Sequence, residues 1–199
     1  MSKKKQNYLW LSRLISRVFD PIVLVPVILI FSVWNAFVNG ERIRFLLFLL
    51  SLDVLLPGVV LYFFIQRDII KSGWDVRKRQ ERVPLFIFVV LAHFIGFMAA
   101  RYLGKEPLAS YLGSFWLLTL VYAFVTLIWK ISVHVGVISA LATFMVLTQG
   151  VGYVPIFGLV LLMIWARVYG RYHTLSQALT GAITPIIILP VCFWLMGLF

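Results

Sequence analysis

The sequence contains one cysteine and seven acidic residues in 199 positions. The cysteine, Cys192, lies in an apolar run and has no second cysteine to pair with, which excludes an intramolecular disulfide and a thiolate metal cluster. No two acids are spaced to share a metal ion on one helical face. This scarcity argues against prenyl and phosphatidyl transferases, which generally hold a divalent metal between paired aspartates. We therefore expect neither a metal nor another cofactor.

Charged residues are also few, and apolar residues make up most of the chain. Only 13% of the residues are charged and 62% are hydrophobic, whereas a soluble domain has about 45–50% apolar residues. This composition predicts an integral membrane protein. The formal net charge is +11, but the Lys and Arg residues lie between apolar segments. Anionic headgroups and phosphorylated lipid are therefore the expected partners, and nucleic acid is not.

The apolar runs predict an all-α polytopic bundle that forms one membrane domain over residues 1–199, with six to seven spans in the lipid bilayer. Basic and apolar residues at helical spacing over 1–18 predict an N-terminal helix in the membrane interface. Asp20 and Pro21 suit the N-cap and first position of the first span. The expected spans are 20–38, 45–65, 84–103, 112–129, 133–149, 154–169 and 176–198, with loops between them.

The order of the spans predicts the orientation of the chain. With seven spans, the N-terminus and the loops Gln66–Val83, Lys130–Ser132 and Gly170–Leu175 lie on one side. Only four of the 18 Lys and Arg residues fall on the other side, namely Arg42, Arg44, Arg101 and Lys105. The positive-inside rule therefore predicts that the N-terminus and these three loops are cytoplasmic.

Three polar clusters share this predicted side: residues 75–84 (DVRKRQERVP), 130–134 (KISVH) and 166–177 (ARVYGRYHTLSQ). Two of the three histidines, His134 and His173, belong to them. Ionisable groups at membrane depth often mark function. A structural explanation also exists, because His173 could be an interfacial histidine and Arg167 a snorkelling arginine at the end of a span.

The clusters resemble the motifs of the type-2 phosphatidic acid phosphatase superfamily of membrane lipid phosphatases, K-x6-R-P, P-S-G-H and S-R-x5-H-x3-D. The resemblance covers residues 75–180. Arg82 stands for the arginine of the first motif, with Lys78 or Arg79 in place of its lysine, and Ser132 and His134 match the second motif. Arg167 and His173 match the third motif at the family's spacing. Gln177 stands where the family has Asp.

The resemblance implies an enzyme that hydrolyses a phosphate monoester or diphosphate of a phospholipid or an isoprenoid, through a phosphohistidine and without metal. It implies that His173 is the nucleophile and that His134 protonates the departing alkoxide. The residues expected to bind the substrate phosphate are Arg82, Lys78, Arg79, Lys130, Ser132, Arg167 and Arg171.

Gln177 leaves two functional readings open. It lies one helical turn after His173, and its oxygen can accept the Nδ1 proton that an Asp would accept in the family, without the charge. Activity is then lower than with Asp or is kept by compensation elsewhere. The alternative function is a non-catalytic lipid-phosphate-binding or transport protein with a degenerate site.

Two further ionisable residues lie in the middle of predicted spans. His93 has no polar neighbour in the sequence, and we interpret it as a packing histidine. Asp53 must be neutral, paired or exposed to water. It could serve a proton path or bond to a neighbouring helix, and we favour the structural role.

Overall fold

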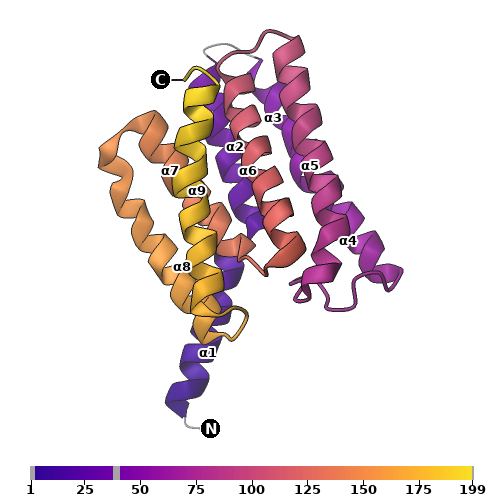
Figure 1. The fold of residues 1–199 in the computed structure, drawn as a ribbon, viewed down its shortest axis with the longest axis vertical. Coiled ribbons are helices and arrows are strands. Elements are labelled where there is room, and N and C mark those ends of the chain that lie inside the picture. The colour runs from indigo at the N-terminus through magenta and orange to yellow at the C-terminus, as the bar shows by residue number, and fades with distance from the viewer. Residues whose placement is uncertain (1–2, 38–40, 199) are drawn as a thin grey trace. The chain divides into compact units, whose positions relative to one another are not determined.

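The structure, a computed structural model, describes residues 3–37 and 41–198, and within these residues every regular element is a helix (Figure 1). The elements are α1 (Lys3–Val18), α2 (Pro21–Ala36), α3 (Arg42–Leu50), the π-helix η1 (Ser51–Leu55), α4 (Leu56–Gln66), α5 (Arg79–Tyr102), α6 (Leu108–Ile128), α7 (Val133–Gln149), the 3-10 helix η2 (Val151–Ile156), α8 (Phe157–Tyr169) and α9 (Leu175–Leu195).

The all-α prediction is confirmed. Among the described residues, six helical stretches are long and apolar enough to cross a membrane, as expected of a multi-pass membrane protein. The remaining apolar helix, α7, has only 17 residues. Many large apolar side chains, such as Ile128, Leu161 and Trp194, are exposed on the helix surfaces, where a lipid environment would cover them.

Several predicted boundaries are wrong. The helix α6 begins at Leu108, inside the expected loop Gly104–Tyr111, and α9 ends at Leu195 instead of residue 198. The expected loop Gln149–Tyr153 already contains the start of η2, since short 3-10 turns commonly lead into α-helices. The loop predicted over Gln66–Val83 ends early because Lys78 is extended and α5 begins at Arg79. The second span begins at Arg42 instead of residue 45. Parts of three predictions lie outside the described residues. They are residues 1 and 2 of the N-terminal helix, residue 38 of the first span and the start of the loop Asn39–Arg44.

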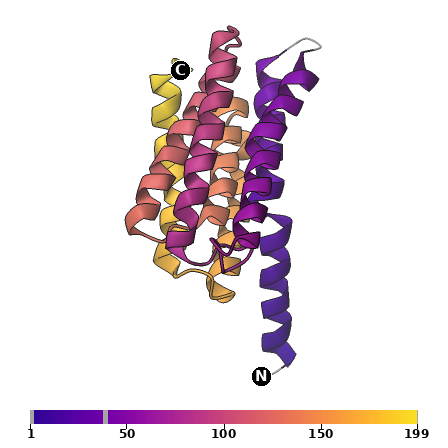
Figure 2. The same ribbon diagram turned by 90° about the vertical axis from the view of Figure 1, so that its right-hand side faces the viewer.

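The helices group into two compact units. The first comprises residues Met1–Leu24 and Lys130–Pro190, and the second comprises Val25–Trp129 and Val191–Phe199. In the first unit α7 packs against α8, and α8 also packs against α1. In the second unit α5 and α6 lie side by side along their length, as both views show (Figures 1 and 2).

The helix predicted at the N-terminus is present as α1. Two of its serines, Ser12 and Ser16, lie one turn apart and are buried, whereas Trp10 is exposed. The ring of Tyr8 meets the ring of Trp165 on α8 edge-on, with centroids 6.5 Å apart. Small residues one turn apart allow close helix packing in membranes, so α1 is held to α8 and turns bulky apolar groups outward. Its placement in the membrane interface stays a prediction.

The second unit is built around an apolar core to which α2, α3, α5 and α6 contribute. Its fully or nearly buried members are Leu29, Val33, Leu49, Ala100, Leu108, Ala109 and Leu112. At Gly96 of α5, an added Cβ would lie 3.1 Å from the side chain of Leu49 on α3. The absence of a side chain at this position therefore permits the close approach of α5 to the helix formed by α3, η1 and α4.

The π-turn of η1 places Asp53 inside the second unit. Asp53 is buried, and its Oδ1 lies 3.9 Å from Nε2 of His93 on α5. Nδ1 of His93 lies 2.9 Å from Oγ1 of Thr119 on α6, whose hydroxyl donates to the carbonyl of Phe115. The histidine Nδ1 is therefore the donor to Thr119. His93 thus has two polar neighbours that are distant in sequence, and His93 is the ionisable group that this contact places next to Asp53.

Candidate functional site

The third cluster of the sequence begins where α8 ends. The N–H of Tyr172 donates to the carbonyl of Arg167 at 3.0 Å, and the N–H of Arg171 donates to that of Val168 at 3.0 Å. These two bonds form the Schellman arrangement that closes a helix. Arg171 occupies its left-handed position at φ 59°, where glycine is usual. The turn reverses the chain so that His173 directly follows the end of the helix.

Tyr172 covers the guanidinium of Arg167. The guanidinium carbon lies 4.1 Å from the centroid of the Tyr172 ring, and Arg167 is 1% exposed. Gly170 makes this packing possible, because a Cβ there would lie 2.7 Å from the same ring. A cation against an aromatic face is stabilised by the ring quadrupole. Arg167 is therefore a fixed internal charge, in contrast to a snorkelling side chain at the surface.

His173 and Gln177 are hydrogen-bonded, as the sequence predicts. Nδ1 of His173 lies 3.2 Å from Oε1 of Gln177. The same oxygen accepts from the N–H of Thr174 at 3.2 Å, and the N–H of Gln177 donates back to Oγ1 of Thr174 at 3.3 Å. This reciprocal pair is a capping box of the T-x-x-Q type at the start of α9. Sequence reasoning missed it, although the residues Thr174-Leu-Ser-Gln177 before an apolar run are its usual signal.

The capping box determines the tautomer of His173. A backbone N–H can only donate, so the Gln177 atom that faces Thr174 is the oxygen. The histidine Nδ1 that faces the same oxygen must then be the donor. In the neutral ring, Nε2 consequently carries the lone pair. His173 is buried, with 7% of its surface exposed.

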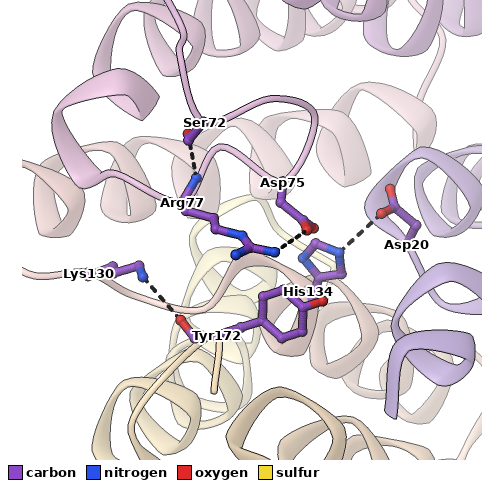
Figure 3. Close-up of polar contacts among 7 residues, drawn as sticks. All are labelled: Asp20, Ser72, Asp75, Arg77, Lys130, His134 and Tyr172. Atoms are coloured by element: carbon purple, nitrogen blue, oxygen red, sulfur yellow. Dashed lines mark hydrogen bonds and ion pairs between the residues drawn. The ribbon is translucent and has the colours of Figure 1, made fainter. Parts of the chain in front are cut away.

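The segment between α6 and α7 joins the second cluster to the third. Nζ of Lys130 donates to the carbonyl of Tyr172 at 3.0 Å (Figure 3). The N–H of Ser132 donates to the carbonyl of Gln177 at 3.3 Å. Gly181 on α9 allows this approach, because a Cβ there would lie 2.6 Å from the Ser132 carbonyl oxygen. The start of α7 and the start of α9 therefore meet at one end of the first unit.

Ser132 and the beginning of α7 supply hydrogen-bond donors at this meeting point. Ser132 is fully buried, and its hydroxyl has no hydrogen-bond partner among the described residues. It occupies the N-cap position of α7 without capping the helix through its side chain. The leading N–H groups of a helix favour an anion. The Ser132 hydroxyl and the leading N–H groups of α7 therefore lie at the same end of this helix.

His134 lies in the first turn of α7 and pairs with a residue from the N-terminal part of the chain. Its Nε2 lies 3.1 Å from Oδ2 of Asp20 (Figure 3). Oδ1 of Asp20 accepts from the N–H of Ile22 at 3.0 Å, which confirms Asp20 as the N-cap of α2. No local pattern signals the pairing with His134, because the two residues are 114 positions apart.

The first cluster lies in the second unit. Arg82 is buried and donates through Nε to the carbonyl of Val76 at 2.8 Å. Arg79 donates to the carbonyl of Thr126 at the end of α6 at 3.3 Å. Nζ of Lys78 lies 3.6 Å from Oε1 of Glu81.

Around this cluster, the loop before α5 is held by its own polar contacts. The guanidinium of Arg77 lies 3.7 Å from the carboxylate of Asp75, and the backbone N–H of Arg77 donates to Oγ of Ser72 (Figure 3).

Through the bonds of Lys130 and Ser132, the structure joins the residues of the second and third clusters within one unit. The participation of Arg82, Arg79 and Lys78 in the same site stays a prediction.

Comparisons with known protein families, with curated proteins and with solved structures found no match to this chain. Among the described residues, no three His, Cys, Asp or Glu side chains are grouped as metal ligands.

Proposed function

We propose that the protein is a membrane-embedded phosphatase that hydrolyses a phosphate monoester or diphosphate of a lipid or isoprenoid through a phosphohistidine. The observation that carries the proposal is the geometry of His173. Its Nδ1 faces Oε1 of Gln177 at 3.2 Å, and the capping box identifies that atom as an acceptor. The ring therefore presents Nε2 as a basic nitrogen, which a nucleophile attacking phosphorus requires.

The donors around His173 suit a phosphoryl group. Arg167 is buried next to Tyr172, Lys130 bonds to the carbonyl before His173, and the Ser132 hydroxyl is buried at the positive end of α7. Such fixed donors and charges stabilise the negative charge that develops on the phosphoryl oxygens. Arg171 is proposed as an additional phosphate ligand, and the phosphate-binding roles of Arg82, Arg79 and Lys78 stay predictions from the sequence.

The reaction takes place in two displacements. Nε2 of His173 attacks phosphorus, the N–P bond forms, and the P–O bond to the lipid breaks as His134 gives its proton to the departing oxygen. Water then attacks the phosphohistidine, the N–P bond breaks, and His134 recovers a proton from the attacking water. Inorganic phosphate and the lipid alcohol, or the lipid monophosphate from a diphosphate, are released.

The non-catalytic alternative also has an observation in its favour. Gln177 has a complete structural role in the capping box with Thr174, so its presence needs no catalytic explanation. An amide stabilises a charged imidazole less than a carboxylate does. A lipid-phosphate binder or transporter would retain the donors and lack turnover.

Phosphate release from detergent-purified protein distinguishes the two functions. We expect release from at least one of phosphatidate, phosphatidylglycerol phosphate and a prenyl diphosphate, with loss in His173→Ala and retention in His93→Gln as the matched control. Undiminished release in excess EDTA would exclude a metal route. Gln177→Asp should raise the rate of an enzyme, whereas binding without release in both proteins would support the binder.

We also propose that the site end of the first unit faces the cytoplasm. In a Cys192→Ala background, Ser176→Cys lies at the exposed start of α9 and Gly152→Cys at the opposite end of the η2–α8 span. An impermeant thiol reagent should label only the Gly152→Cys protein in intact cells. Labelling of Ser176→Cys alone would reverse the orientation.

A further inference from the structure

Asp20 is the only carboxylate in the sequence of the first unit. The same unit contains eight basic residues: Lys3, Lys4, Lys5, Arg13, Arg17, Lys130, Arg167 and Arg171. Asp20 forms a hydrogen bond with a histidine in this strongly basic setting, since its Oδ2 lies 3.1 Å from Nε2 of His134. The pairing places the one negative side chain of the unit next to a residue proposed to transfer a proton.

The two oxygens of Asp20 have different partners. Oδ1 accepts the N–H of Ile22 at the start of α2, and Oδ2 faces His134. The first bond holds the carboxylate at the end of a helix, so its position is set by the backbone. A carboxylate that accepts two such bonds is favoured in its ionised form. The bond to His134 is then donated by Nε2–H, and Nδ1 is the nitrogen whose proton can be transferred.

The two histidines of the site consequently have partners of different charge. His173 donates to the neutral amide oxygen of Gln177, and His134 donates to the carboxylate of Asp20. A carboxylate stabilises an imidazolium, whereas an amide fixes a tautomer without favouring the charge. Environments that separate the protonation of two groups in this way assign one as acid and the other as nucleophile.

We propose that Asp20 is a positioning residue that holds His134 protonated and oriented, so that its Nδ1 proton passes to the departing lipid oxygen. This inference rests on the proposed phosphatase function. In the first displacement the Nδ1–H bond of His134 breaks as the P–O bond breaks, and the proton completes the lipid alcohol. Neutral His134 then takes a proton from the attacking water through Nδ1.

Other charged groups also act on this pair. The charge of Arg167 on α8 acts on Asp20, and Lys130, Arg171 and His173 are the further charged and titratable groups of the polar clusters in this unit. The three cations, Arg167, Lys130 and Arg171, disfavour a charged His134, whereas His173 as a neutral imidazole adds no charge. Asp20 is the group in the unit that opposes them.

Substitutions at Asp20 can separate this role from helix capping. Asn and Ser are N-caps comparable to Asp, so Asp20→Asn and Asp20→Ser keep the start of α2 and remove the charge. With phosphatidate, whose leaving group is an alkoxide, kcat should fall by about 10- to 100-fold. This loss is smaller than the about 100- to 10,000-fold that a general acid supplies, because His134 itself remains. With 4-nitrophenyl phosphate, whose leaving phenolate needs no proton, the fall should be less than about threefold. The alkaline limb of the phosphatidate rate profile should move to lower pH.

His173→Ala distinguishes failure of this inference from failure of the proposed function. It should abolish release from both substrates, because it removes the nucleophile. If His173→Ala is inactive and the Asp20 variants lose equal activity on both substrates or none, the role of Asp20 is wrong. If His173→Ala remains active, the proposed function is wrong. In a His134→Ala background, Asp20→Asn should have no further effect on kcat.

A spectroscopic titration tests the pairing without turnover. The sequence has only three histidines, so ring-¹⁵N-labelled protein gives three sets of signals that His93→Gln and His134→Gln assign. In Asp20→Asn protein, the titration of His134 should move to lower pH while that of His173 moves less. An unchanged His134 titration would overturn the proposal, whatever the activity of the protein.

Discussion

Substitution of Gly181 by alanine tests how the site is assembled. The added Cβ would lie 2.6 Å from the carbonyl oxygen of Ser132 and 3.3 Å from its Cβ, so α9 and the start of α7 must separate. Overpacking of this kind costs about 1–3 kcal/mol. Separation also weakens the bond from the Ser132 N–H to the Gln177 carbonyl, which contributes about 1 kcal/mol. We expect Gly181→Ala to lower the free energy of unfolding by about 2–4 kcal/mol.

The same displacement should reduce activity more than stability alone explains. Gln177 lies on the turn of α9 that must move, and its side chain orients His173. A shift of about 1 Å in a reacting group can cost about 100-fold in rate. The assays are unfolding in mixed micelles followed by circular dichroism, and phosphate release at a temperature where the variant is folded.

Gly158→Ala is the matched control for this experiment. Gly158 lies in α8, and an added Cβ there meets nothing within 4 Å. Alanine in a helix is more favourable than glycine by about 1 kcal/mol, so the control should be unchanged or more stable. Equal stability and activity of the Gly181→Ala and Gly158→Ala proteins would refute the close contact between α9 and Ser132.

Three further predictions concern local structure. Arg171→Gly should raise the free energy of unfolding by about 1 kcal/mol, because glycine adopts the left-handed conformation at φ 59° without strain; no change or a loss in mixed-micelle unfolding would contradict this. Gln177→Ala should lower the free energy of unfolding by about 1 kcal/mol, because it opens the capping box with Thr174. Gln177→Glu should keep the capping box and the stability. Equal melting temperatures of the two variants would contradict the capping role. Burial raises the pKa of Glu106, but hydrogen bonds from Ser110 and Arg101 outweigh it, so the pKa is lowered overall. The contribution of the Glu106 carboxylate to stability should therefore be present at neutral pH and lost as the pH falls below about 4.3. Glu106→Gln should remove that part of the acid dependence. An identical pH dependence of unfolding in the native and Glu106→Gln proteins would contradict this prediction.

The helices could be predicted from the sequence because each apolar run specifies its own span. The observed α2 and α7 lie within the predicted ranges. The exceptions occur where local geometry departs from the regular α-helix. The π-turn around Asp53 interrupts a run that is uniformly apolar on both sides, and its position depends on packing against α5 and not on hydropathy.

The candidate site was predictable in part. The one-turn spacing of His173 and Gln177 correctly predicted their hydrogen bond, because helix periodicity fixes which side chains meet. The pairing of Asp20 with His134 depends on tertiary structure, and no spacing rule relates residues 114 positions apart. The role of Gly181 was also hidden, since a sequence does not reveal what an absent side chain would touch.

A covalent intermediate on His173 tests the central claim most directly. Protein incubated with phosphatidate labelled with ³²P in the phosphate group, quenched in alkali and digested, should yield a labelled peptide that contains His173, because phosphohistidine survives alkali and is lost in acid. The label should be absent from His173→Ala and present in His93→Gln. Turnover of the native protein without any such label, or equal labelling of the His173→Ala protein, would contradict the account.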